Sequence, residues 1–116
     1  MTTRTILAAL AAFAASALLP AAGQAASFDC AKASTPTEHA ICDNPQLSSL
    51  DEQTAGLYYT LISGGAPDAT ASVADVKAQQ VKFLQQRNAC GANYNCLIDA
   101  YTSQIMYLKA ASGQGM

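Results

Sequence analysis

The chain has 116 residues, 51% of them hydrophobic and 12% charged, and its formal net charge at pH 7 is −2. This length corresponds to one domain with a modest hydrophobic core. Eight acidic residues against six basic ones, without a basic cluster, argue against nucleic acid or anionic lipid as the partner and leave a cationic protein partner open.

The N-terminal segment has the composition of a secretory signal peptide. Arg4 precedes an apolar run from Ile6 to Leu19, and Pro20 ends that run. Small residues follow at Gly23 and Ala25, the positions that a signal peptidase recognises. A retained membrane anchor is the alternative, but the run is short for a membrane span and lacks stop-transfer charges.

We expect cleavage after residue 25, so that removing 25 residues from 116 leaves a mature domain of 91, residues 26–116. Loss of Arg4 changes the formal net charge from −2 to about −3. The residues before the first cysteine, Ser27 to Asp29, do not form a lipid-attachment signal. The sequence therefore predicts a soluble periplasmic or secreted protein with no membrane anchor after signal cleavage.

Four cysteines, Cys30, Cys42, Cys90 and Cys96, lie in the mature part, and export would bring them to an oxidising compartment. Four cysteines allow three pairings. Eleven residues separate the first two and five separate the last two, which favours Cys30 with Cys42 and Cys90 with Cys96. Zinc binding is the alternative, but no Cys-x-x-Cys spacing is present and the single histidine, His39, stands alone.

The mature part contains a succession of helix signals and no alternating strand pattern. The first predicted helix is short. Thr35 can cap it, Pro36 suits its first position, and Glu38 completes a capping box, so the helix should run to about Cys42.

A second helix is predicted to start where Asn44 can cap and Pro45 can occupy the first turn, and Gly64 and Gly65 end it. Its apolar or near-apolar positions recur every three or four residues and therefore share one face. These positions are Leu47, Leu50, Thr54, Leu57, Tyr58, Leu61 and Ile62.

After the turn-rich stretch 63–68, a third helix of about twenty residues is predicted from helical spacing. Its stripe comprises Val73, Val76, Gln80, Phe83, Leu84 and Arg87. Glycine and asparagine then interrupt the chain. A fourth helix places Leu97, Tyr101, Ile105 and Leu108 on one face, and the tail from about residue 111 is expected to be disordered.

The short connections between the three longer helices predict an up-down-up arrangement, with the short first helix across one end. The predicted fold class is therefore all-α: a small antiparallel bundle of about four helices, the first short, stapled by two disulfides.

The sequence contains no recognisable catalytic arrangement. A nucleophile elbow, a His-Glu-x-x-His helix and a phosphate-binding glycine loop are absent. Asp51 and Glu52 are adjacent, so on a helix they diverge by about 100° and cannot act as a facing pair. His39 has no nucleophile nearby and is interpreted as solvated. We predict that the protein is not an enzyme and binds no cofactor or metal.

Two polar residues, Gln80 and Arg87, fall on the core-facing stripe of the third helix. A buried guanidinium without a partner is strongly destabilising, so we expect Arg87 to pair with Asp51 on the second helix. Gln80 and Tyr58 are expected to complete this structural polar network. The alternative places Arg87 on a solvated edge, where it interacts only with the helix dipole.

Several blocks of the mature chain follow one another in a characteristic order: 28–33, 37–42, 47–51 followed by Tyr58, 80–90 and 96–108. Together they resemble, over nearly the whole mature chain, the lysozyme inhibitor LprI N-terminal domain family. Phe83 stands where the family often has tryptophan, and Gln104 where it often has arginine. The resemblance implies an exported helical domain and, as its activity, inhibition of a lysozyme by binding.

The segment closed by the last two cysteines is the candidate partner-binding site, because a rigid aromatic provides contact area at little entropy cost. Its residues are Asn93, Tyr94 and Asn95, with Asp99 and Glu38 as rim charges. Alternatively, Tyr94 only covers the nearby disulfide. The partner would be a cationic lysozyme or another envelope protein. The second hypothesis is a periplasmic structural or adaptor protein with no lysozyme target.

Overall fold

The computed structural model describes residues 26–114, so the predicted signal peptide lies outside the described residues. A 3-10 turn, η2 (Cys30–Lys32), precedes four α-helices: α1 (Pro36–Asp43), α2 (Pro45–Ile62), α3 (Val73–Ala89) and α4 (Tyr94–Ala111). Residues 26–114 include no β-strand. The all-α class predicted from the sequence is confirmed.

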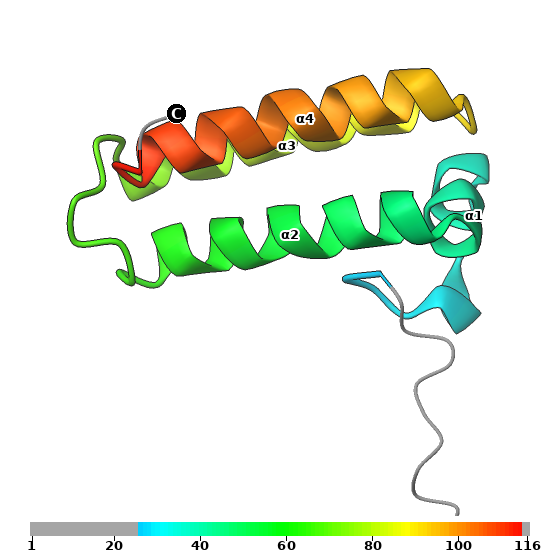
Figure 1. Ribbon diagram of the computed structural model, residues 1–116, viewed down its shortest axis with the longest axis horizontal. Helices are drawn as coiled ribbons and strands as arrows, with labels where there is room; N and C mark the ends of the chain where they lie inside the picture. Colours follow the sequence, from blue (N-terminus) through cyan, green and yellow to red (C-terminus); the bar gives the residue numbers. More distant parts are fainter. Residues whose placement is uncertain (1–25, 115–116) are drawn as a thin grey trace, which may run out of the picture.

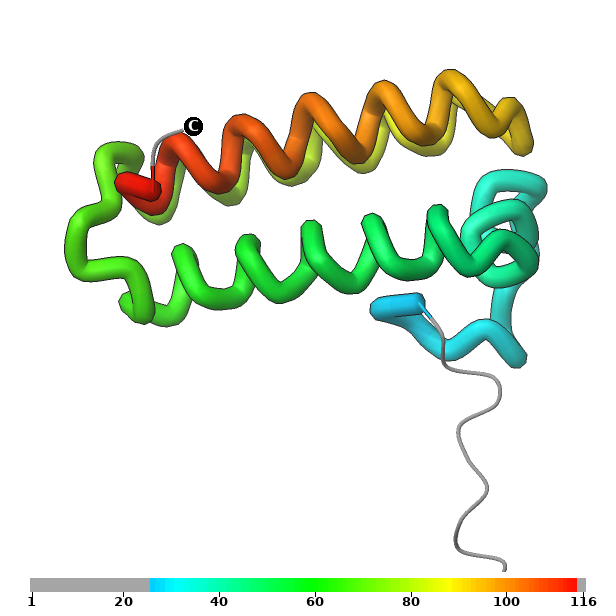
Figure 2. Tube along the Cα trace, in the orientation of Figure 1, coloured from blue at the N-terminus to red at the C-terminus, as the bar shows by residue number. Residues whose placement is uncertain are grey.

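The three long helices form an antiparallel bundle. The chain runs along α2, returns along α3 and reverses again along α4, while the short α1 lies across the end at which α2 and α4 begin (Figures 1 and 2). Each long helix packs against the other two, and α1 packs against the start of α2. This is the predicted up-down-up arrangement.

The first two helices begin at the capping residues that the sequence predicts. The Thr35 hydroxyl accepts a 3.0 Å hydrogen bond from the Glu38 N–H, and the Glu38 carboxylate accepts one of 3.3 Å from the Thr35 N–H. Asn44 Oδ1 accepts hydrogen bonds from the first backbone N–H groups of α2. Each cap satisfies donors that a helix N-terminus leaves unpaired.

The C-terminal end of α4 is tied to the loop between α2 and α3. The Thr70 N–H donates a 2.7 Å hydrogen bond to the Ala111 carbonyl, and Ser112 is buried. Gly113 has a φ of 85°, and a Cβ there would lie 2.4 Å from the Asp68 carbonyl oxygen. The expectation of a disordered tail from about residue 111 is therefore wrong at these positions, because the loop covers them.

The core has two parts. The part at the α1 end contains Ala26, Ile41, Leu47, Phe83, Leu97 and Tyr101, and the part at the opposite end contains Leu61, Val76, Leu108 and Ala111. The predicted stripe of α4 is buried throughout. On α3, however, Val73 and Leu84 are 42% and 36% exposed. The buried face of α3 is narrower than predicted, since only Val76, Phe83 and Arg87 are buried.

Both disulfides have the predicted pairing, with Cα–Cα distances of 5.8 Å for Cys30–Cys42 and 5.6 Å for Cys90–Cys96. The Thr37 hydroxyl joins the two stapled segments, because it donates a 2.8 Å hydrogen bond to the Gly91 carbonyl. Disulfides of this kind form in oxidising compartments. The bonds therefore indicate an extracytoplasmic environment.

Candidate functional site

A buried carboxylate, Asp51, lies inside the α1 half of the bundle. Nη1 of Arg87 lies 3.4 Å from Asp51 Oδ1, and the Tyr101 hydroxyl donates a 2.6 Å hydrogen bond to the same oxygen. Asp51 is 4% exposed and Arg87 8%. The predicted pairing of these two residues is confirmed, and the alternative of Arg87 on a solvated edge is wrong.

The second carboxylate oxygen of Asp51 binds the N-terminal segment. Ser27 donates to Oδ2 through its backbone N–H at 2.8 Å and also through its hydroxyl. The remaining donors of Arg87, Nε and Nη2, lie 3.1 and 3.0 Å from Asn88 Oδ1. Asp51 thus joins the N-terminal segment, α2, α3 and α4.

Burial of the Tyr101 hydroxyl, reinforced by the Asp51 charge, raises the pKa of Tyr101 well above its ordinary value. The phenol therefore remains a hydrogen-bond donor. The sequence carried a signal for this role, because a tyrosine on a buried stripe requires a partner for its hydroxyl. Ser27 carried no such signal, since it precedes every predicted helix.

Gln80 does not join this network, contrary to the prediction. Its Oε1 accepts a 2.9 Å hydrogen bond from Nε2 of Gln104 on α4. Gln104 is only 2% exposed. The reason is axial distance, because Gln80 precedes Arg87 by seven residues, or about 10 Å along a helix. The polar residues of α3 thus form two separate contacts.

The prediction for Tyr58 is also wrong. It is half-buried, packs against the core at the end away from α1, and contacts the Tyr59 ring edge-on at 5.9 Å between centroids. Tyr58 lies seven residues after Asp51 on α2, so the same axial spacing removes it from the carboxylate.

The candidate binding residues 93–95 belong to the start of α4 rather than to a projecting loop. Asn93 is the N-cap, and its Oδ1 accepts a 2.9 Å hydrogen bond from the Cys96 N–H. Tyr94 is 41% exposed, and its hydroxyl donates a 2.6 Å hydrogen bond to Gln46 Oε1 on α2. Asn95 and Asp99 are exposed on the same helix. Tyr94 is therefore a fixed aromatic at the stapled end of the bundle.

Carboxylates outnumber cations in the half of the bundle that contains α1 and the two disulfides. In the α1 half of the described chain, the carboxylates that are exposed or half-buried belong to Asp29, Glu38, Asp43, Glu52 and Asp99. Lys32 and, near the middle of α3, Lys82 are exposed cations in the same half, whereas Arg87 is buried against Asp51. A hydrogen bond from the Ser34 N–H lowers the pKa of Glu38 and favours its charged form. The stapled end is therefore negatively charged.

A groove of about 600 Å³ lies between α2 and α3. Its lining includes Tyr58, Tyr59, Val81, Leu84 and Phe28. Tyr59 is 66% exposed and Val81 56%, so these apolar side chains are open to solvent. The sequence did not predict this surface, because Tyr59 and Val81 lie outside the helical stripes predicted for α2 and α3.

Within residues 26–114, no three His, Cys, Asp or Glu side chains are placed to hold a metal ion. In the same part of the chain, no helix combines the length and apolar character needed to cross a membrane. The chain matches no protein-family model, and neither a curated protein nor a solved structure shows significant similarity to it. The family resemblance of the sequence therefore stays a prediction.

Proposed function

We propose that this protein is exported to the periplasm or secreted, and that it binds and blocks a cationic lysozyme that degrades the cell wall. The observation that carries the proposal is that Tyr94, 41% exposed, lies in the half of the bundle that also carries five exposed or half-buried carboxylates. The sequence resemblance to the LprI N-terminal domain family supports the same activity.

The charge distribution favours association with a basic enzyme. A surface with an excess of carboxylates raises the rate of encounter with a cation, and this effect weakens as salt screens it. Steering does not by itself select a partner, so a shaped contact is also required.

Tyr94 supplies that contact. Its bond to Gln46 and the adjacent Cys90–Cys96 disulfide hold the ring in place before binding. A ring held in this way loses little conformational entropy when a partner covers it, so more of the contact energy is available for affinity.

The proposal is tested by a cell-wall turbidity assay with chicken-type, goose-type and invertebrate-type lysozymes. We expect dose-dependent inhibition that weakens with added salt. Asp43→Asn and Asp99→Asn should each weaken it several-fold, whereas Asp68→Asn, at the opposite end of the bundle, should not. Absence of inhibition of all three lysozyme classes at micromolar protein would reject the proposal.

A second candidate is a structural or adaptor role in the periplasm. The groove between α2 and α3 favours it, since its lining exposes apolar side chains beside polar ones such as Lys77 and Gln80, and exposed apolar surface marks interaction sites. Val81→Lys would replace an apolar side chain of the groove by a charged one. Under the adaptor role this variant loses association with an envelope protein, whereas under the lysozyme proposal it inhibits like the parent protein.

A further inference from the structure

The residue that follows the predicted cleavage position is held inside the bundle. Ala26 is 5% exposed and belongs to the core part that contains Leu47 and Tyr101. The next residue, Ser27, donates two hydrogen bonds to the buried carboxylate of Asp51. The start of the predicted mature chain is thus fixed by apolar and polar contacts.

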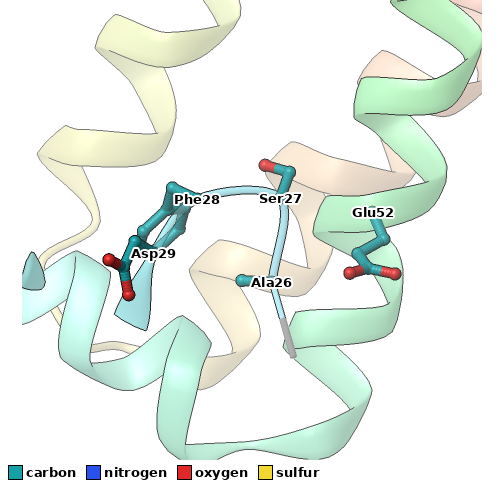
Figure 3. Close-up of a pocket in the computed structure, with 5 residues that line it drawn as sticks. All are labelled: Ala26, Ser27, Phe28, Asp29 and Glu52. Atoms are coloured by element: carbon teal, nitrogen blue, oxygen red, sulfur yellow. The ribbon is translucent and has the colours of Figure 1, made fainter. Parts of the chain in front are cut away.

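A cavity of about 360 Å³ lies beside this segment, lined by Ala26, Ser27, Phe28, Asp29 and Glu52. Figure 3 shows the Glu52 side chain extending from α2 beside the segment that contains Ala26 and Ser27. The lining residues include two carboxylates and no basic side chain. A positive charge placed at Ala26 would therefore border a cavity lined by carboxylates and by no cation.

We propose that signal-peptide removal supplies this charge and further stabilises the fold. Hydrolysis of the Ala25–Ala26 peptide bond by a leader peptidase consumes one water and leaves a carboxylate on Ala25 and an α-ammonium group on Ala26. The new ammonium docks against Glu52 at the rim of the cavity. The proposal rests on the export proposed above and is independent of lysozyme binding.

Other charges near the new terminus determine the strength of this contact. Asp51 and Asp29 add to the negative potential of Glu52. The Arg87 guanidinium opposes it, although its charge is offset by pairing with Asp51. The neutral phenol of Tyr101 contributes no charge. The net charge around the Ala26 nitrogen is therefore negative, which favours the ammonium form and opposes the effect of burial, which disfavours it.

The test uses the full chain, expressed in an exporting bacterium, with the processed product purified and its N-terminus identified by mass spectrometry. Transamination with pyridoxal phosphate then converts the N-terminal alanine to a pyruvoyl group and removes the ammonium. We expect the Tm to fall by about 4 °C, a shift that corresponds to a weak ion pair in a domain of this size.

Two variants decide whether Glu52 receives the ammonium. In Glu52→Gln, removal of the ammonium should leave the Tm almost unchanged. Asp99→Asn removes an exposed carboxylate from α4. In this variant, removal of the ammonium should lower the Tm as much as in the parent protein. NMR titration should place the Ala26 α-amine pKa above the ordinary range of about 7.7–8.0, and Glu52→Gln should return it to that range.

Equal Tm losses in the parent protein and both variants would overturn the proposal, as would an N-terminus other than Ala26. A product that keeps residues 1–25 after export would overturn both this inference and the proposed location. If the processed product has the same Tm before and after transamination, this inference alone is overturned.

Discussion

Tyr101 on α4 and Asp51 on α2 are joined by a 2.6 Å hydrogen bond in the interior of the bundle. The same carboxylate oxygen faces the guanidinium of Arg87 at 3.4 Å. All three side chains are nearly inaccessible to water, so removing one of them leaves a buried polar group without its partner. This cluster therefore makes the stability of the bundle sensitive to single polar substitutions.

Arg87→Ala should lower the free energy of unfolding by about 3 kcal/mol, because it leaves the Asp51 charge buried without its cation. Lys82→Ala, an exposed change on the same helix, should cost about 0.5 kcal/mol or less. Urea denaturation followed by circular dichroism measures both. Equal small losses in the two variants would show that the Arg87–Asp51 contact does not stabilise the fold.

Tyr101→Phe removes the hydroxyl and keeps the ring, so it measures the contribution of the hydroxyl alone. The ring keeps its contact with Phe83, whose centroid lies 5.3 Å away, while Asp51 loses its shortest contact with α4. The expected loss is about 2 kcal/mol, the cost of an unsatisfied buried acceptor. Tyr59→Phe, at a largely exposed tyrosine, is the matched control and should unfold at the same urea concentration as the parent protein.

The capping box of α1 should contribute to acid stability. Because the folded pKa of Glu38 lies below its ordinary value of 4.5, this contribution is present above pH 4.5 and is lost as the pH falls through the folded pKa. Glu38→Gln should therefore show a smaller fall in Tm between about pH 5 and pH 3 than the parent protein. Parallel Tm curves for the two proteins would contradict this assignment.

The pairing of the two disulfides can be tested by mass spectrometry, and the contribution of each to stability by replacing its cysteines. Non-reducing mass spectrometry of a digest should recover Cys30 linked to Cys42 and Cys90 linked to Cys96. Replacing the first pair by serine should cost about 3 kcal/mol and the second about 2 kcal/mol, because the first closes the longer loop. Crossed peptides, or free thiols in protein recovered from the envelope, would contradict the pairing.

Much of the fold follows from local signals in the sequence. Thr35 and Asn44 cap the first two helices at the positions where the sequence predicts caps. The stripe of α4 is buried throughout because a period of three to four residues defines one face. The pairing of Arg87 with Asp51 was predictable because a charge on a buried face requires an opposite charge.

The remainder depends on tertiary contacts that no local period encodes. Ser27 reaches Asp51 across 24 positions of the chain, and the Gln80–Gln104 pair depends on how α3 and α4 align along their axes. The predicted binding segment was only partly anticipated. Its asparagines and its tyrosine were recognised, but the Tyr94–Gln46 bond depends on how the first turn of α2 lies beside the first turn of α4.

The lysozyme turbidity assay, repeated with Tyr94→Ala, tests the proposed function most directly. Tyr59→Ala, which removes a tyrosine from the α2–α3 groove, is the matched control, and circular dichroism checks that helical content is unchanged. We predict that the parent protein and Tyr59→Ala inhibit equally and that Tyr94→Ala loses inhibition. Absence of inhibition by the parent protein, or inhibition that survives Tyr94→Ala and disappears in Tyr59→Ala, would contradict the account.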